Sequence, residues 1–142
     1  MSEVSHGQPN RKRSVVAVSV GVIAVIIISL VVDEILHLAH VYPDWGEPMW
    51  SPRLNALALS YRIIIGVFGS YLAARLAPRR PMKHAMIVGI IGFVLSGVAV
   101  VGTMMMEKKP GPTWYPVALW LTALPCAWLG GLWYRASARG RV

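Results

Sequence analysis

Four long apolar runs alternate with short polar segments along this chain. They cover residues 14–38, 53–77, 82–106 and 113–134. An α-helix rises about 1.5 Å per residue, so each run is long enough to cross a hydrocarbon core of about 30 Å. The pattern predicts an all-α, polytopic membrane protein, built as a bundle of four transmembrane helices.

Little of the chain lies outside these runs. Residues 1–13 are polar and basic, residues 135–142 form a short basic tail, and residues 14–134 make one membrane domain. The first run resembles a signal peptide, but no small-x-small cleavage motif follows it, so we expect a retained anchor. The single cysteine, Cys126, excludes an intrachain disulfide.

Basic residues give the chain a net charge of +8, and their distribution predicts its orientation. If the chain crosses four times, Arg53, Lys108 and Lys109 lie on one side and most other Lys and Arg residues on the opposite side. The positive-inside rule then places both termini in the cytoplasm. We expect a collar that attracts anionic lipid headgroups: Arg11, Lys12, Arg13, Arg75, Arg79, Arg80, Lys83 and Arg135. No folded domain presents these charges to nucleic acid, so that partner is not expected.

Arg62 lies deep inside the second run, where a charge costs roughly 2.5 kcal/mol or more in lipid. On a helix it shares one stripe with Asn55, Gly66, Gly69 and Ala73, so it should face a neighbouring helix. Small residues make similar stripes in the third and fourth runs, as expected where membrane helices pack closely. These stripes are Gly89, Gly92, Ser96, Ala99 and Thr103, and Ala123, Ala127 and Gly130.

Asp33 and Glu34 are the acidic residues at a depth comparable to that of Arg62. Measured along their helices, Asp33 lies about 10 Å and Arg62 about 13 Å from the same membrane surface. Pairing would turn two costly charges into one tolerable pair, so one of these acids should contact Arg62. The predicted intramembrane polar cluster is Asp33, Glu34, His37, His40, Asn55 and Arg62.

A metal site is a second reading of part of this cluster. Glu34 and His37 have the Glu-x-x-His spacing of metal half-sites, and His40 follows one turn later. One such motif supplies few ligands, so no cofactor is predicted, and metal binding by Glu34, His37 and His40 stays an alternative. No catalytic residues are expected, since Cys126 has no histidine near its depth.

Two further features concern helix organisation. Residues 20–23, VGVI, echo residues 88–91, VGII. Residues 69–72, GSYL, before Arg75 similarly echo residues 130–133, GGLW, before Arg135. These echoes suggest a parallel two-plus-two repeat. Pro125 lies in the middle of the fourth run, and a proline there removes a backbone hydrogen bond and should bend the helix.

Residues 61–92, YRIIIGVFGSYLAARLAPRRPMKHAMIVGIIG, and residues 111–131, GPTWYPVALWLTALPCAWLGG, resemble uncharacterised small four-helix membrane proteins of bacteria. The resemblance also extends to the Asp-Glu-x-x-His end of the first run. It implies a bacterial inner membrane and brings no activity with it.

Three classes of function follow from these features. We expect a structural or interaction subunit of a membrane assembly, with other membrane helices and lipids as its partners, in a homo-oligomer or a larger complex. The alternative is a small transporter or channel acting as a homo-oligomer, because four thin helices do not easily enclose a path. The third class is a metal-binding protein or enzyme that uses the cluster on the outer face.

Overall fold

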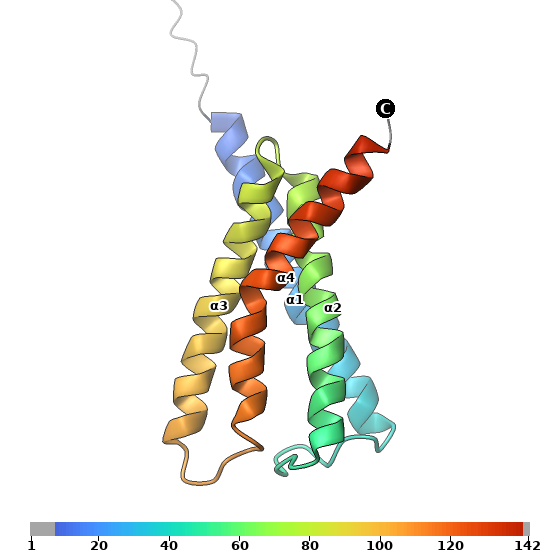
Figure 1. Ribbon diagram of the computed structural model, residues 1–142, viewed down its shortest axis with the longest axis vertical. Coiled ribbons are helices and arrows are strands. Elements are labelled where there is room, and N and C mark those ends of the chain that lie inside the picture. The colour runs from blue at the N-terminus through green and yellow to red at the C-terminus, as the bar shows by residue number, and fades with distance from the viewer. Residues whose placement is uncertain (1–7, 141–142) are drawn as a thin grey trace, which may run out of the picture.

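The computed structural model describes residues 8–140, and these residues form four helices joined by loops (Figure 1). The helices are α1 (Gln8–Leu38), α2 (Pro52–Leu76), α3 (Pro81–Met105) and α4 (Trp114–Arg139). All four are long and apolar enough to span a membrane, in agreement with the predicted all-α fold and multi-pass chain. Helix α1 begins before the predicted run and α4 ends after it, so both helices continue into the flanking basic segments.

The bundle has two unlike ends (Figure 1). The start of α1, the short α2–α3 connection and the end of α4 lie at one end of the bundle, although α1 and α4 point away from each other there, and we call this the basic end. The two longer connections, residues 39–51 and 106–113, lie at the opposite end, which we call the loop end. Prolines begin both α2 and α3, at positions where a helix needs no N–H donor from the residue.

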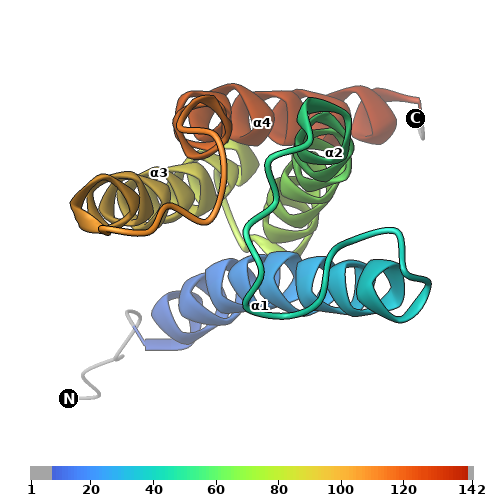
Figure 2. The same cartoon turned by 90° about the horizontal axis from the view of Figure 1, so that it is seen from below.

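Helix α2 is the centre of the fold, since it packs against α1, α3 and α4. Helices α3 and α4 also pack along one another. Helix α1 contacts α2 and α3, but within the described residues it makes no contact with α4. Seen from the loop end, α1 lies across the bundle from α4 (Figure 2).

Small residues let the helices approach closely, as the stripes predicted. A Cβ added at Gly69 would lie 2.3 Å from Val25 on α1, and one at Gly130 would lie 2.4 Å from the Val67 carbonyl oxygen on α2. At Gly89 the added atom would lie 2.3 Å from Ala127 on α4. In the stripe on α3, Gly89 is buried against α4, but Ala99 is exposed and so does not pack against another helix.

Two predictions about helix organisation have different outcomes. Helix α4 changes direction part-way along (Figure 1), and it remains helical through Pro125, as expected of a proline bend. Gly21 and Gly89, which match in the echoing segments, each lie against the second helix of their own hairpin. The repeat itself stays a prediction.

Candidate functional site

An ion pair joins α1 and α2 in the half of the bundle nearest the loop end. Arg62 Nη2 lies 2.5 Å from Asp33 Oδ2, and Asp33 is only 8% exposed. The predicted acidic partner of Arg62 is therefore confirmed as Asp33. Glu34 is exposed instead, because neighbouring residues on a helix point about 100° apart.

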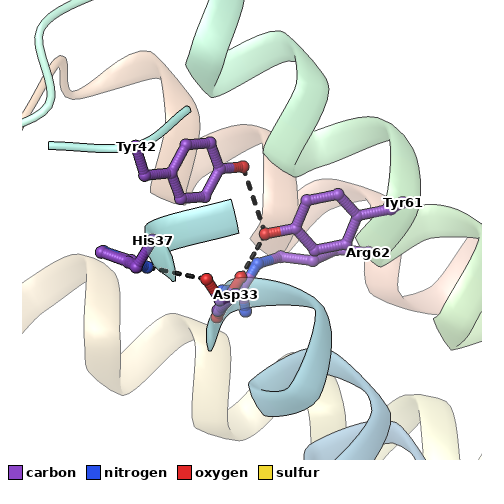
Figure 3. Close-up of polar contacts among 5 residues, drawn as sticks. All are labelled: Asp33, His37, Tyr42, Tyr61 and Arg62. Atoms are coloured by element: carbon purple, nitrogen blue, oxygen red, sulfur yellow. Dashed lines mark hydrogen bonds and ion pairs between the residues drawn. The ribbon is translucent and has the colours of Figure 1, made fainter. Parts of the chain in front are cut away.

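Two tyrosines extend this pair into a hydrogen-bonded chain (Figure 3). The Tyr61 hydroxyl donates to Asp33 Oδ1, so both carboxylate oxygens have a donor. The Tyr42 hydroxyl, from the loop after α1, donates to the Tyr61 hydroxyl over 3.2 Å. Burial raises the pKa of Tyr42 above its ordinary value, which keeps this hydroxyl protonated and able to donate.

Arg62 has hydrogen-bonding capacity that the pair does not use. Its Nε atom is buried and has no partner among the described residues. Tyr115 of α4 adjoins the guanidinium group, and the Tyr61 ring lies 5.8 Å from its central carbon, within range of a cation–π contact. The Arg62 side chain is still 32% exposed, so it remains open to a further partner.

His37 organises the end of α1 and the loop that follows. Its Nδ1 lies 2.7 Å from the Asp33 carbonyl oxygen, and its ring stacks on Trp45 at 3.9 Å. The Tyr42 ring meets His37 edge-on. A carbonyl only accepts, so Nδ1 carries the proton in this contact. His37 thus fixes the loop that positions Tyr42.

The structure does not assemble the metal site considered for Glu34, His37 and His40. Within the described residues, no three His, Cys, Asp or Glu side chains are placed to share a metal ion. His40 lies beyond the end of α1 with a left-handed φ of 54°, so it no longer follows the helical spacing that grouped it with Glu34. His37 uses its Nδ1 for the Asp33 carbonyl oxygen, and its ring stacks on Trp45.

The Asn55 side chain forms hydrogen bonds with the loop before α2 and not with the ion pair. It is 2% exposed, and its Nδ2 donates to the Met49 and Ser51 carbonyl oxygens, each at 2.9 Å. The Met49 N–H in turn donates to the Pro110 carbonyl, which ties the two connections of the loop end together. Among residues 8–140 Asn55 makes no hydrogen bond to the charged residues with which the sequence grouped it, because its partners lie at the start of α2 and in the loop before it.

Two neighbouring hollows that share part of their lining lie beside the ion pair. The first, which we call the side groove, has a volume of about 430 Å³ between α1 and α3, and its polar wall is formed by Ser29, Asp33, Arg62 and Ser96. The second, the inner cavity, has a volume of about 190 Å³ and extends deeper, to Ser70, Thr122 and Cys126. Ser29, Arg62 and Ser96 line both hollows. No histidine lines the inner cavity, so Cys126 has no base beside it there.

The predicted collar lies at the basic end, where all its members are exposed: Arg11, Lys12, Arg13, Arg75, Arg79, Arg80, Lys83 and Arg135. The acidic residues of the described chain lie elsewhere. Asp33 and Glu34 belong to the last turns of α1, and Asp44, Glu47 and Glu107 belong to the loop end. The collar charges therefore have no acidic neighbour at their own end among residues 8–140.

Sequence reasoning missed Tyr42, Tyr61, Tyr115 and Ser29. Tyr61 offered a signal, since a tyrosine hydroxyl inside an apolar run needs a partner, and it directly precedes Arg62. Ser29 lies one turn before Asp33 on the same face of α1. No protein-family model, curated protein or solved structure matches this chain.

Proposed function

We propose that this chain is an interaction subunit of a membrane assembly, located in a bacterial inner membrane with the basic end in the cytoplasm. A partner's transmembrane helix would lie along the side groove, between α1 and α3. The observation that carries this proposal is the polar wall of that groove, which includes Arg62 and Asp33. In a bilayer, acyl chains offer these groups no hydrogen bonds.

The groove opens sideways between two helices. Ile26, Leu30 and Leu95 form its apolar rim and are 47%, 57% and 57% exposed. A hollow of about 430 Å³ has room for the side chains of an approaching helix, while the helix itself would rest on the rim. Helices associate in membranes through such close packing and through interhelical hydrogen bonds.

The groups in the groove favour a particular kind of partner helix. Both Asp33 carboxylate oxygens already accept a hydrogen bond, so the carboxylate needs no further donor from a partner. The Arg62 side chain is 32% exposed and carries more N–H donors than its bond to Asp33 uses, which calls for a hydrogen-bond acceptor. We therefore expect a partner with small residues on one face and a Ser, Asn, Gln or carboxylate side chain at the depth of Arg62.

Photocrosslinking tests this proposal in native membranes. A photoreactive residue placed at Leu30 or Leu95 should give a discrete protein adduct, and one at Leu121, 60% exposed and lining neither hollow, should give only lipid adducts. Filling the groove with Ser96→Phe should remove the adduct formed from Leu30. Lipid adducts alone at all three positions would refute the interaction role, and an adduct of twice the chain's mass would identify the partner as a second copy.

Transport is the second candidate, and the inner cavity favours it. This cavity continues from the groove toward the middle of the bundle, where its wall includes Ser70, Thr122 and Cys126. Beyond it, close contacts at Gly21, Gly69 and Gly130 leave no room for an added Cβ. A polar hollow near the middle of a helical bundle, closed on one side, is where transporters hold their substrate, and in a transporter it would open to water on one face of the membrane.

The native cysteine distinguishes the two candidates without any substitution. Cys126 is 7% exposed and faces the inner cavity. A water-filled transport cavity would let a membrane-impermeant thiol reagent react with Cys126 in intact cells, and Cys126→Ala provides the unreactive control. Protection of Cys126 in native membranes, followed by labelling after detergent removes the partner, supports the interaction role.

A further inference from the structure

A second pocket lies at the basic end, opposite to the side groove. Its volume is about 410 Å³, and it lies between the start of α1 and the α2–α3 connection. Four basic side chains line it: Arg11, Arg79, Arg80 and Lys83. We propose that this pocket is a specific site for a phosphate group, most simply that of an anionic phospholipid.

Within residues 8–140, no acidic side chain lies near the charges around the pocket. Among residues 8–140, every acidic side chain belongs to the last turns of α1 or to the loop end. Four cations that line one pocket repel one another unless an anion is bound between them. Arginine and lysine side chains around one hollow are the usual means of binding phosphate.

The start of α3 adds a second source of positive potential. Helix α3 begins at Pro81, beside this pocket, with no side-chain cap and no acidic residue in its first turn. The unsatisfied N–H groups of a helix start favour anions. An Asp or Ser cap would normally neutralise this end, and here basic residues surround it instead.

His84 supplies a buried polar group in the wall of the pocket. It is 7% exposed, and its Nδ1 lies 3.2 Å from the Arg80 carbonyl oxygen. Since that carbonyl accepts, Nδ1 carries the proton and fixes the ring. In the described residues only Nδ1 of this ring is hydrogen bonded, which leaves Nε2 for a ligand.

The backbone at Arg80 is held in an uncommon conformation. Arg80 has a φ of 50°, in the left-handed region that residues other than glycine seldom adopt, and Pro81 follows it. Its carbonyl also accepts the Lys83 N–H at 3.0 Å. This turn brings Arg79, Arg80 and Lys83 to one pocket, and local strain of this kind is concentrated at functional sites.

The surroundings of the pocket suit a lipid more than a soluble phosphate. Ile87 forms part of its wall, and Val15, Val16 and Ile90, 66%, 56% and 52% exposed, lie on the adjoining surfaces of α1 and α3. Acyl chains can follow these apolar surfaces while the phosphate occupies the basic pocket. A water molecule takes up about 30 Å³, so about 410 Å³ holds a phosphate with its ester groups.

The site differs from general attraction of lipids to the collar, and matched variants separate the two. Arg11→Gln/Arg79→Gln/Lys83→Gln removes three charges from the pocket and leaves Arg80 and its turn intact. Lys12→Gln/Arg13→Gln/Arg135→Gln removes three charges from the same end, none of which lines the pocket. If the pocket is a specific site, only the first triple variant should lose the bound phospholipid.

Native mass spectrometry of the full chain, purified with phosphatidylglycerol and phosphatidylcholine in equal amounts, measures the bound lipid. Wild-type protein should retain one phosphatidylglycerol, the pocket variant should bind it about tenfold more weakly, and the collar variant should change less than about twofold. If the wild-type protein retains both lipids and retains them equally, the proposal is overturned, even if a variant failed to fold; if it retains neither, the pyrophosphate measurement decides. Equal losses in the two variants would also overturn the proposal.

A soluble ligand is tested separately with inorganic pyrophosphate. If pyrophosphate raises the thermal stability of the wild-type protein but not of the pocket variant, and phosphatidylglycerol is not retained, the phosphate site stands with a soluble source. If neither ligand binds, the proposal is wrong. These measurements concern the basic end alone, so their outcome is independent of whether a partner helix occupies the side groove.

Discussion

Arg62 and Asp33 approach to 2.5 Å although they lie on different helices, and Tyr61 donates to the other oxygen of the same carboxylate. This arrangement stabilises a charge pair in a region where neither charge is tolerated alone. Its consequences for stability are measurable, because each member can be removed separately.

Removing Arg62 alone should destabilise the protein by about 3–5 kcal/mol, since it leaves the Asp33 carboxylate buried without its cation. The double variant Arg62→Leu/Asp33→Leu should recover most of this loss. Thermal unfolding in detergent measures both effects. Glu34→Gln/Arg62→Leu is the matched control, and it should not recover stability, because Glu34 is exposed and makes no ion pair among the described residues. Rescue by Glu34→Gln would mean that the pairing is wrong.

The two tyrosines should contribute unequally. Tyr61→Phe deprives a carboxylate oxygen of its donor and should cost about 1–3 kcal/mol. Tyr42→Phe removes a donor to a hydroxyl that already engages Asp33, so it should cost about 1 kcal/mol or less. Tyr71→Phe serves as a control, because Tyr71 makes aromatic contacts with Trp133 and Tyr134 that phenylalanine preserves. Equal losses for Tyr42 and Tyr61 would contradict this hierarchy.

Gly130 is the most sensitive test of helix packing. An added Cβ there would lie 2.4 Å from the Val67 carbonyl and 2.8 Å from the Tyr71 backbone nitrogen, so α2 and α4 would have to separate. We expect Gly130→Ala to lower the melting temperature. Gly102→Ala is the matched control, because a Cβ at Gly102 meets nothing within 4 Å, and alanine favours a helix over glycine by about 1 kcal/mol. The two substitutions should therefore act in opposite directions.

The proposed orientation is tested by reporter fusions. A reporter at either terminus should be active in the cytoplasm, and one inserted near Glu47 or Gly111 should be external, because Lys and Arg gather at the opposite end. Neutralising the collar should weaken this preference. An external C-terminus would contradict a four-span chain with both ends inside.

The sequence predicted those contacts whose absence would carry a large free-energy cost in the membrane. A charge inside an apolar run needs a partner, and matching depths along two helices left only Asp33 and Glu34 as choices. Glycine spacing predicted the close contacts at Gly69, Gly89 and Gly130 for a similar reason, since helices in lipid need close backbone approach.

The parts that it missed depend on how the chain turns and how the helices are arranged. Tyr42 reaches Tyr61 only because the chain reverses at His40, in a left-handed conformation that residue spacing does not reveal. The side groove is lined by residues of all four helices, and no residue pattern along one helix predicts how the four are arranged around it. Within the described residues Glu34, His37 and His40 do not come together as a metal site, because the helical spacing ends at Leu38, before His40.

The order of the ion pair along the chain has a consequence for biosynthesis. Helix α1 emerges from the ribosome before α2, so the Asp33 carboxylate is already in the membrane when Arg62 arrives. Helix α2 is much less hydrophobic than α1 and carries the arginine, so its own insertion is the less favourable of the two. We therefore expect the first helix to assist insertion of the second, so that Asp33→Leu lowers the fraction of chains in which α2 spans the bilayer.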